Sequence, residues 1–295
     1  MLNLQIRLSP APSSLRLNPM VESLGPWDIE VKTFPGGEVR LKLPNYKVEV
    51  ERIRSADVTA RITNSEQFMA LLMTVDAIRR RSPGVKVNLF LPYMPYARQD
   101  RVCNDGEPLS VKVAADMINS LKLNTVTVLD PHSDVSPALL DNCVVLDQLA
   151  LLKKLNLPWG EITLVAPDAG AVKKVEKLHA ALGTKRLVTA TKHRDTQTGY
   201  ITDTTLDANV QGERLLVIDD IFDGGRTFLE LGKVLASKGA ANAELFVTHG
   251  IFSQGYNAIT EYFSHIYTTN SFHEKGNGDR RPDDTIDKQY TWLQV

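Results

Sequence analysis

The chain has 295 residues, 43% hydrophobic and 23% charged, with a formal net charge of −1 at pH 7, a composition typical of soluble globular proteins with room for two domains of about 150 residues. Lys and Arg are scattered along the chain without a basic stripe, which argues against nucleic acid or a membrane as the partner. No segment approaches the roughly 18 apolar residues of a membrane span, and the two cysteines, Cys103 and Cys143, fit no metal-cluster spacing and favour a reducing, cytoplasmic location.

Apolar runs rich in β-branched residues alternate with segments of helical periodicity. The spacing predicts strands at residues 4–8, 39–43, 85–91, 125–129, 162–166, 187–190, 215–218, 243–248 and 266–269, and helices at 65–80, 110–121, 170–182 and 227–238. This alternation predicts an α/β protein with mostly parallel twisted sheets flanked by helices, whose ligands bind outside the carboxyl ends of the strands. We expect two similar domains, residues 1–143 and 144–295.

The segment after the predicted strand 85–91 reads LPYMPYARQDR. Arg98 can clamp phosphate oxygens with two hydrogen bonds, Gln99 can bind a base or ribose, and Asp100 follows directly. These residues are suited to a nucleotide. Taken alone, the segment is more often a solvated charged turn, and both interpretations stay open.

Polar side chains also follow two later strands. His132 comes after the strand 125–129, and Asp168 comes after the strand 162–166. Mg²⁺ takes one or two carboxylates together with substrate phosphates and waters, so this pair suits the ion only loosely. Either residue alone is more often structural than a ligand.

Two cations, Lys192 and Arg194, begin a polar loop in the sequence TKHRD. Cations that close over a reacting phosphate are what phosphoryl-type transfer requires. On statistics alone they are surface charges.

The most informative stretch is LLVIDDIFDGGRT, residues 215–227. Asp219 and Asp220 follow four apolar residues of a predicted buried strand, and they can accept hydrogen bonds from a ribose diol. The loop that opens the next helix offers backbone N–H groups and a helix dipole to a phosphate. An ordinary acidic strand-to-helix turn is the alternative. The residues of this loop are Asp223, Gly224, Gly225, Arg226 and Thr227.

Together these motifs resemble the ribose-phosphate pyrophosphokinase family over nearly the whole chain. The matching segments are, in order, residues 34–38 (FPGGE), 93–101 with YARQD intact, Asp130 and His132, residues 167–170 (PDAG), Lys192 and Arg194, residues 219–227, 248–253 (THGIFS) and 269–271 (TNS). Their order and number make coincidence an untenable explanation.

The resemblance implies a type I phosphoribosyltransferase-like fold and an enzyme that moves the β,γ-diphosphoryl group of ATP to the 1-hydroxyl of ribose 5-phosphate, leaving AMP. It further implies Mg²⁺ as cofactor and a homodimer or higher homo-oligomer. By this resemblance the catalytic residues are Lys192 and Arg194, and the residues on the metal side are His132 and Asp168. The residues expected to bind ATP are Phe34, Glu38, Arg98, Gln99 and Asp100. The residues expected to bind ribose 5-phosphate are Asp219, Asp220 and 223–227.

The sequence departs from the family pattern in several places. Gly36 replaces the usual Asp or Asn near the base, Ala171 replaces a second Gly, and the sugar-phosphate loop contains Arg226 in an altered order. Three alternatives therefore stand beside the main prediction. They are the same chemistry on a larger acceptor such as ADP-ribose, a phosphoribosyltransferase, and a non-catalytic regulatory relative.

Overall fold

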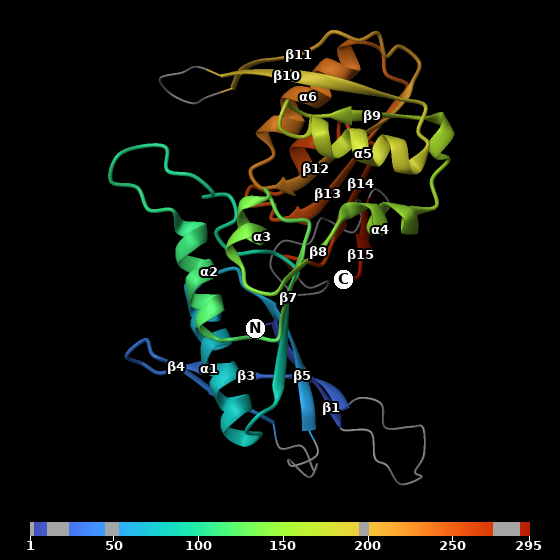
Figure 1. The fold of residues 1–295 in the computed structure, drawn as a ribbon. Helices are drawn as coiled ribbons and strands as arrows, with labels where there is room; N and C mark the ends of the chain where they lie inside the picture. Colours follow the sequence, from blue (N-terminus) through green and yellow to red (C-terminus); the bar gives the residue numbers. More distant parts are fainter. Residues whose placement is uncertain (1–2, 11–23, 45–52, 195–200, 274–289) are drawn as a thin grey trace, which may run out of the picture. The chain divides into compact units, whose positions relative to one another are not determined.

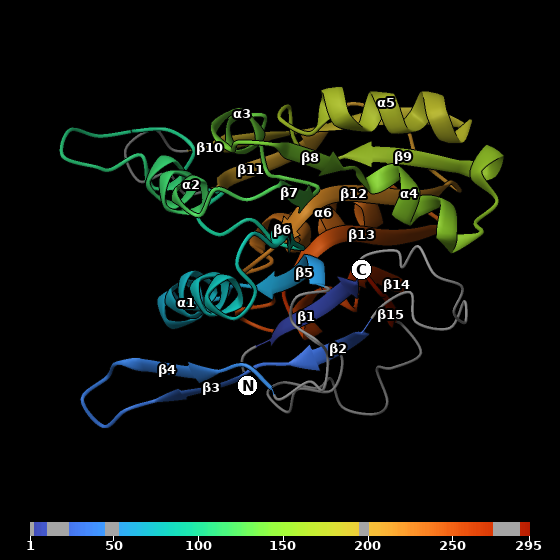
Figure 2. The same cartoon turned by 60° about the horizontal axis from the view of Figure 1, so that its bottom comes forward.

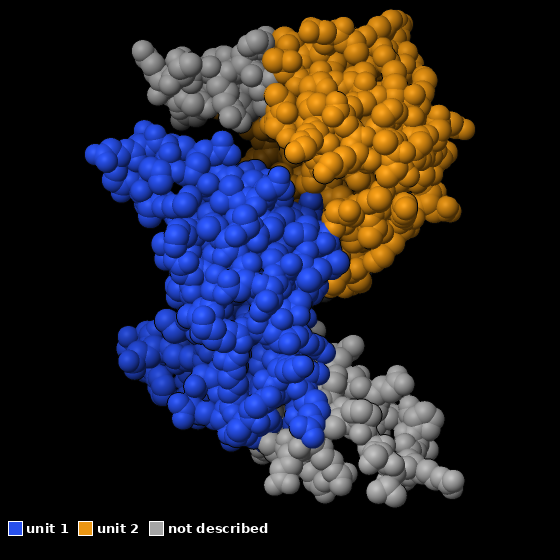
Figure 3. Space-filling view, viewed as in Figure 1, with its two compact units in different colours: residues 1–146 blue, residues 147–295 orange. Residues whose placement is uncertain are grey.

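The structure, a computed structural model, describes residues 3–10, 24–44, 53–194, 201–273 and 290–295. The chain divides into two compact units, Met1–Leu146 and Asp147–Val295 (Figure 3). Each unit has its own sheet and its own hydrophobic core. Among the described residues, no helix has the length and apolar character needed to cross a bilayer.

The described residues of unit 1 form a large sheet, helices and a separate hairpin (Figure 1). Its elements are β1 (Asn3–Pro10), β2 (Leu24–Asp28), β3 (Glu30–Thr33), β4 (Val39–Lys42), β5 (Ile53–Arg61), α1 (Ser65–Arg81), β6 (Lys86–Leu91), α2 (Ser110–Ser120), β7 (Thr125–Leu129), α3 (Val135–Leu139) and β8 (Cys143–Leu146). The sheet order is β2-β1-β5-β6-β7-β8, with β5 to β8 parallel. The hairpin β3–β4 forms its own two-stranded sheet.

Helix α1 shows how local sequence builds this unit. Asn64 caps its first turn by accepting a hydrogen bond from the Gln67 N–H at 2.9 Å, and Gln67 Oε1 accepts from the Thr63 N–H at 2.6 Å. Side-chain caps of this kind satisfy amides that have no intrahelical partner. The buried positions recur every three or four residues and face the core. They include Phe68, Leu71, Val75 and Ile78.

Unit 2 is a seven-stranded sheet with helices on its faces. Its elements are α4 (Gln148–Leu152), η2 (Lys153–Leu155), η3 (Trp159–Glu161), β9 (Ile162–Ala166), α5 (Val172–Leu182), β10 (Arg186–Arg194), β11 (Ile201–Leu206), β12 (Arg214–Phe222), α6 (Arg226–Ser237), β13 (Asn242–Gly250), η4 (Asn257–Ile259), β14 (His265–Thr269) and β15 (Tyr290–Leu293). The sheet order is β11-β10-β9-β12-β13-β14-β15, parallel except for β11.

The order of this sheet contains a topological switch point. From β9 the chain crosses through α5 to β10 on one side, whereas from β12 it crosses through α6 to β13 on the other. Because such crossovers are right-handed, the two helices lie on opposite faces of the sheet (Figure 2). Ligands of open α/β sheets bind where the strand order reverses in this way. The carboxyl ends of β9 and β12 are therefore the place to look for a site.

Strand β12 is longer than the predicted strand 215–218. It stays paired with β13 as far as Phe222 opposite Gly250, whereas its ladder with β9 ends at Val217 opposite Val165. The expectation that Asp219 and Asp220 follow the strand was wrong, because both lie inside it. Their carboxylates interrupt the apolar run, but the neighbouring β13 continues to provide backbone partners.

Other predicted elements agree closely with the structure, and some strands were missed. The predicted strands 125–129 and 162–166 match β7 and β9, and the four predicted helices match α1, α2, α5 and α6 within about two residues at each end. The missed β5 lies in the middle of its sheet, but its core-facing residues include Ala56 and Ala60, which carry little strand preference. The missed β11 lies in the polar loop that was predicted to begin at Lys192 and Arg194, and it pairs antiparallel with β10.

Candidate functional site

Two adjacent carboxylates stand at the switch point of unit 2. Asp220 is buried, Asp219 is half-buried, and the Asp220 N–H donates to Asp219 Oδ1 at 2.9 Å. Asp168 follows the neighbouring β9, where its Oδ1 accepts from the Ala171 N–H at 3.1 Å. The structure thus brings together three acidic side chains that the sequence had placed in two separate motifs.

This gathering of negative charge shows in the acidity of Asp219. Burial raises the pKa of Asp219 well above its usual range, and the neighbouring charges of Asp220 and Asp168 raise the pKa further. Hydroxyl donors or a cation brought by a ligand would relieve this repulsion. The site is therefore built to accept hydrogen bonds and positive charge at this edge.

The loop after β12 leads into α6 with the geometry of an anion-binding turn. Gly225 is the N-cap residue, with φ of +77°, and its carbonyl accepts from the Leu229 N–H at 3.0 Å. The first N–H groups of a helix have no intrahelical acceptor, so they are available to an anion. Arg226 is the first residue of α6 and is exposed. The predicted phosphate-binding residues 223–227 thus occupy one turn.

Aromatic packing fixes the shape of this turn. A Cβ atom on Gly225 would lie 2.6 Å from the Phe222 ring, so no larger residue fits there. The Phe222 ring stacks on the Phe228 ring, with centroids 5.0 Å apart, and its centroid lies 4.8 Å from that of the Phe252 ring. On the outer side, the Ser253 N–H donates to the Asp223 carbonyl at 3.1 Å. The segment THGIFS, which the sequence singled out without a role, therefore supports the loop.

The predicted cations Lys192 and Arg194 lie on β10 beyond its last pair with β9, Thr189 opposite Ala166. Their backbones pair with β11, Lys192 opposite Thr204 and Arg194 opposite Ile201. Both positions thus follow the same carboxyl edge that carries Asp168. Their side chains lie outside the described residues, and their catalytic role stays a prediction.

In unit 1 a buried carboxylate connects two loops. Asp100 follows β6 and forms an ion pair with Arg101, with Nε 2.8 Å from Oδ1. This guanidinium lowers the pKa of Asp100, and a hydrogen bond from Ser133 and the charge of His132 lower it further. Asp100 and His132 are therefore close together, because the parallel strands β6 and β7 end at the same edge. Arg101 and Ser133 were not among the predicted site residues.

The neighbouring Arg98 and Gln99 are exposed. Gln99 Oε1 accepts from Ser110 Oγ at 2.5 Å, and the Gln99 carbonyl accepts from the Val111 N–H at 3.3 Å. These bonds tie the loop to the start of α2. Arg98 therefore lies exposed on a turn whose backbone these hydrogen bonds fix.

The predicted base loop forms the tip of the β3–β4 hairpin. The Phe34 N–H donates to the Glu38 carbonyl at 2.8 Å, and the Gly37 N–H donates to the Phe34 carbonyl at 2.8 Å. Phe34 is 48% exposed, and the centroid of its ring lies 5.9 Å from the Arg40 guanidinium carbon. An exposed aromatic ring at a defined turn offers a stacking surface for a planar group.

Of the expected metal pair, His132 belongs to unit 1 and Asp168 to unit 2, and their role as metal ligands stays a prediction. Among the described residues no three His, Cys, Asp or Glu side chains are grouped as metal ligands. Asp168 and the Asp219–Asp220 pair provide carboxylate oxygens near one another. Mg²⁺ takes one or two protein carboxylates and completes its coordination with substrate phosphates and water, so the Asp168 carboxylate at this edge suits the ion.

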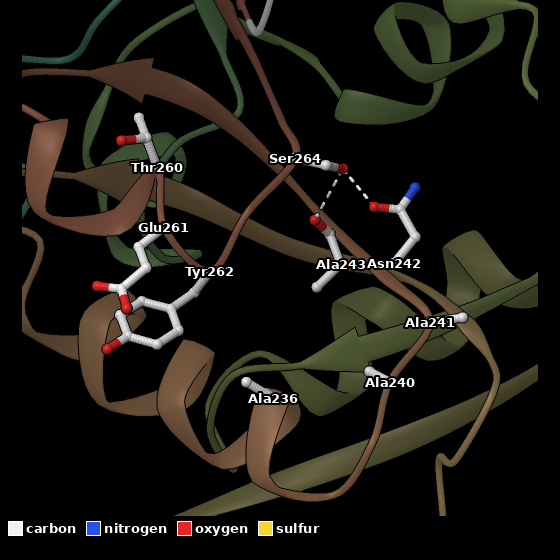
Figure 4. Close-up of a pocket in the computed structure, with 9 residues that line it drawn as sticks. All are labelled: Ala236, Ala240, Ala241, Asn242, Ala243, Thr260, Glu261, Tyr262 and Ser264. Carbon is white, nitrogen blue, oxygen red and sulfur yellow. Dashed lines mark hydrogen bonds between the residues drawn. The ribbon is translucent and has the colours of Figure 1, made fainter.

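A hollow of about 380 Å³ lies at the other end of the same sheet (Figure 4). It is bordered by the start of β13 and the residues before β14, so it faces the amino ends of the strands. None of the predicted site residues lines it. Its lining residues are Ala236, Ala240, Ala241, Asn242, Ala243, Thr260, Glu261, Tyr262 and Ser264.

A parallel sheet whose central strand carries an acidic pair near its carboxyl end and leads into a glycine turn at a helix start is typical of a phosphoribosyltransferase-type domain. Residues 145–276 match the phosphoribosyl transferase domain family, and residues 22–121 match the N-terminal domain of ribose phosphate pyrophosphokinase. The crystal structure of phosphoribosylpyrophosphate synthetase from Mycobacterium smegmatis has the same fold, with a TM-score of 0.76 over 92% of this chain and 87% of that one at 23% identity. The predicted fold class is confirmed.

Curated relatives agree with these matches. The ribose-phosphate pyrophosphokinase of Aquifex aeolicus (strain VF5) is 30% identical over 236 residues, which is 77% of this chain and 72% of that protein. The ribose-phosphate pyrophosphokinase of Agrobacterium fabrum is 30% identical over 233 residues, which is 76% of this chain and 72% of that protein. The chain belongs to the ribose-phosphate pyrophosphokinase family, and the predicted resemblance is confirmed.

We expect Gly225→Ala to destabilise the protein by about 1–3 kcal/mol, because the substitution forces a side chain into a positive φ and against Phe222. Gly224→Ala is the matched control, since its Cβ would lie 3.9 Å from the nearest atom, in Gln254. Urea unfolding measures both free energies. Equal losses in the two variants would contradict the packing described for this turn.

We expect Asp219→Asn to stabilise the folded protein more at pH 8 than at pH 4.5. Because the pKa of Asp219 is raised on folding, the folded state holds its proton more tightly, and wild-type stability falls as the pH rises above the unfolded carboxyl pKa of about 3.9. Melting temperatures at the two pH values measure the effect. The exposed Asp207→Asn is the control, and a gain independent of pH would count against the raised pKa.

Proposed function

We propose that this chain is a ribose-phosphate diphosphokinase, which transfers the β,γ-diphosphoryl group of ATP to the 1-hydroxyl of ribose 5-phosphate and releases AMP. The observation that carries the proposal is that the acidic pair Asp219–Asp220, near the end of β12, is followed a few residues later by the turn at Gly225, at the switch point of unit 2. The activity predicted from the sequence is the one that the names of its relatives carry.

The acceptor binds through two complementary kinds of group. Asp219 and Asp220 accept hydrogen bonds from the ribose hydroxyls, which brings donors to an edge that has too many acceptors. The N–H groups of residues 223–227 and the Arg226 guanidinium hold the 5-phosphate. The sugar is thereby oriented by its hydroxyls at one end and its phosphate at the other.

ATP binds through residues of unit 1. Arg98 and Gln99 place the phosphates and ribose, and Phe34 with Glu38 meets the base. We assign Asp100 a different part from the predicted direct contact with ATP, since its carboxylate is buried against Arg101 and the loop of His132. Asp100 then holds these loops in register for the nucleotide.

Bound Mg²⁺ would supply positive charge to the diphosphoryl oxygens, and Asp168 with His132 would hold it on the protein side. Lys192 and Arg194 contact the transferred group. Because the charge on that group spreads as its bond to AMP loosens, cations that are fixed beforehand stabilise the transition state most. Positioning and electrostatics therefore supply most of the rate acceleration.

The three alternatives receive less support. A simple phosphoribosyltransferase does not account for the match of residues 22–121 to an N-terminal domain of ribose phosphate pyrophosphokinase. The names of the relatives do not favour ADP-ribose as the acceptor. A non-catalytic relative would be expected to lose cationic or metal-side residues, and Lys192, Arg194, His132 and Asp168 are all present.

A homodimer or higher homo-oligomer is part of the proposal. The hairpin tip at Phe34 is exposed and forms a sheet separate from the main sheet of its unit. In the family resemblance this loop is completed by a neighbouring subunit. Sedimentation of the purified chain tests the assembly.

We expect the purified protein to release AMP when ATP, ribose 5-phosphate and Mg²⁺ are all present, with one phosphoribosyl diphosphate formed per AMP. Chelation of Mg²⁺ should abolish the release. Chromatography of the nucleotides measures both products. AMP formation that ignores ribose 5-phosphate, or pyrophosphate release from phosphoribosyl diphosphate and a free base, would contradict the proposal.

We expect Lys192→Ala to lower kcat by on the order of 100-fold or more while KM changes little, because we propose that Lys192 stabilises the transition state more than the bound substrates. The exposed Lys177 of α5 provides a matched control, and Lys177→Ala should leave both constants unchanged. Steady-state AMP assays measure them. Unchanged turnover in Lys192→Ala removes this residue from the catalytic role.

A further inference from the structure

A buried glutamine lies directly behind the acidic pair. Gln148 is the first residue of α4 and is 1% exposed. Its Nε2 donates to the Asp219 carbonyl at 2.6 Å and to Thr248 Oγ1 at 2.8 Å. Because a backbone carbonyl only accepts hydrogen bonds, the nitrogen of the amide must face Asp219, which fixes the orientation of this side chain.

The bond falls where the sheet no longer supports β12 on both sides. The ladder from β12 to β9 ends at Val217, so at Asp219 the strand has a neighbouring strand, β13, on one side only. Gln148 supplies a hydrogen bond to the main chain just past that point. Its second bond, to Thr248 of β13, ties the same amide to the strand that still pairs with β12.

Hydrogen bonds from the end of β14 and the residues after it fix Thr248 in turn. Its carbonyl accepts hydrogen bonds from Thr269 Oγ1 at 2.7 Å and from Ser271 Oγ at 3.1 Å. The Ser271 hydroxyl also lies 2.8 Å from His249 Nδ1. All four side chains are buried. The segments 248–253 and 269–271, which the sequence marked without explaining them, form a fixed support for the Gln148 amide.

The oxygen of the Gln148 amide, in contrast to its nitrogen, contributes unfavourably to the free energy of folding. Gln148 Oε1 is buried and has no hydrogen-bond partner among the described residues. A buried acceptor without a partner costs free energy, and an apolar side chain of the same shape would avoid that cost. Stability alone therefore gives a weak reason for a glutamine here, whereas its amide nitrogen donates both to the main chain of β12 at Asp219 and to Thr248 of β13.

We propose that Gln148 is a positioning residue for the acceptor site: it fixes the main chain at Asp219 against β13 and so holds the Asp219–Asp220 pair where the sugar hydroxyls bind. The inference rests on the proposed function for the identity of the ligand. Gln148 itself touches the strand, and it acts on ribose 5-phosphate only through the carboxylates.

The test is Gln148→Met, which removes both donors and the unpartnered acceptor at nearly constant volume. The first readout is ribose 5-phosphate binding by calorimetry without ATP, and the second is KM for each substrate. We expect the affinity for ribose 5-phosphate to fall on the order of 10-fold, the scale of one lost hydrogen bond, with KM for ATP unchanged. Gln148→Asn has an amide that is too short to reach both partners, so it should lower the affinity for ribose 5-phosphate in the same way. This variant replaces Gln148→Met in the test if the Met variant does not fold.

Thr163→Val is the matched control for a merely structural effect. Thr163 is fully buried in β9 and donates to Glu213 Oε2 at 2.5 Å, at the opposite end of the same sheet. This variant should lower the melting temperature and leave the affinity for ribose 5-phosphate unchanged. Wild-type affinity in a folded Gln148 variant, or an equal loss in Thr163→Val, overturns the positioning role. A wild-type chain that binds ribose 5-phosphate without forming AMP overturns the proposed function alone.

Discussion

The site depends on a mismatch between two neighbouring strands. Because β12 continues past the end of its ladder with β9, its last residues form an edge at the point where the strand order of the sheet reverses. Asp219 and Asp220 occupy that edge, and Asp168 follows the shorter neighbour. Burial and mutual repulsion raise the pKa of Asp219 there, which is unfavourable for the empty fold and favourable for a ligand that brings hydroxyl donors.

The proposed anion site lies beside an acidic pair, and the two differ in the hydrogen-bonding groups that they offer. The carboxylates provide only acceptors, whereas the turn into α6 provides backbone donors, with Gly225 pressed on the Phe222 ring so that the turn keeps its shape. A ribose phosphate carries donors on its ring and acceptors on its phosphate. The order of residues along one strand and turn therefore matches the order of groups along one ligand.

Much of the site was predictable because its chemistry is local in sequence: residues 219–227 contain the carboxylates, the turn and the start of the helix together. The extent of β12 was not, since only its pairing with β13 shows that the strand continues through two Asp residues. Strand β5 escaped prediction because two of its core-facing residues, Ala56 and Ala60, carry little strand preference. Gln148 lies on a five-residue helix, 71 residues from Asp219 in sequence, and nothing in its local pattern separates it from a surface glutamine.

The most direct test of this account is where ribose 5-phosphate binds, mapped by the backbone amide shifts of isotope-labelled protein during a titration. The account predicts that the largest shifts fall on residues 223–227 and on Asp219 and Asp220, and that they saturate together. Shifts concentrated instead around the hollow at residues 240–243 and 260–264, at the amino ends of the strands, would contradict it.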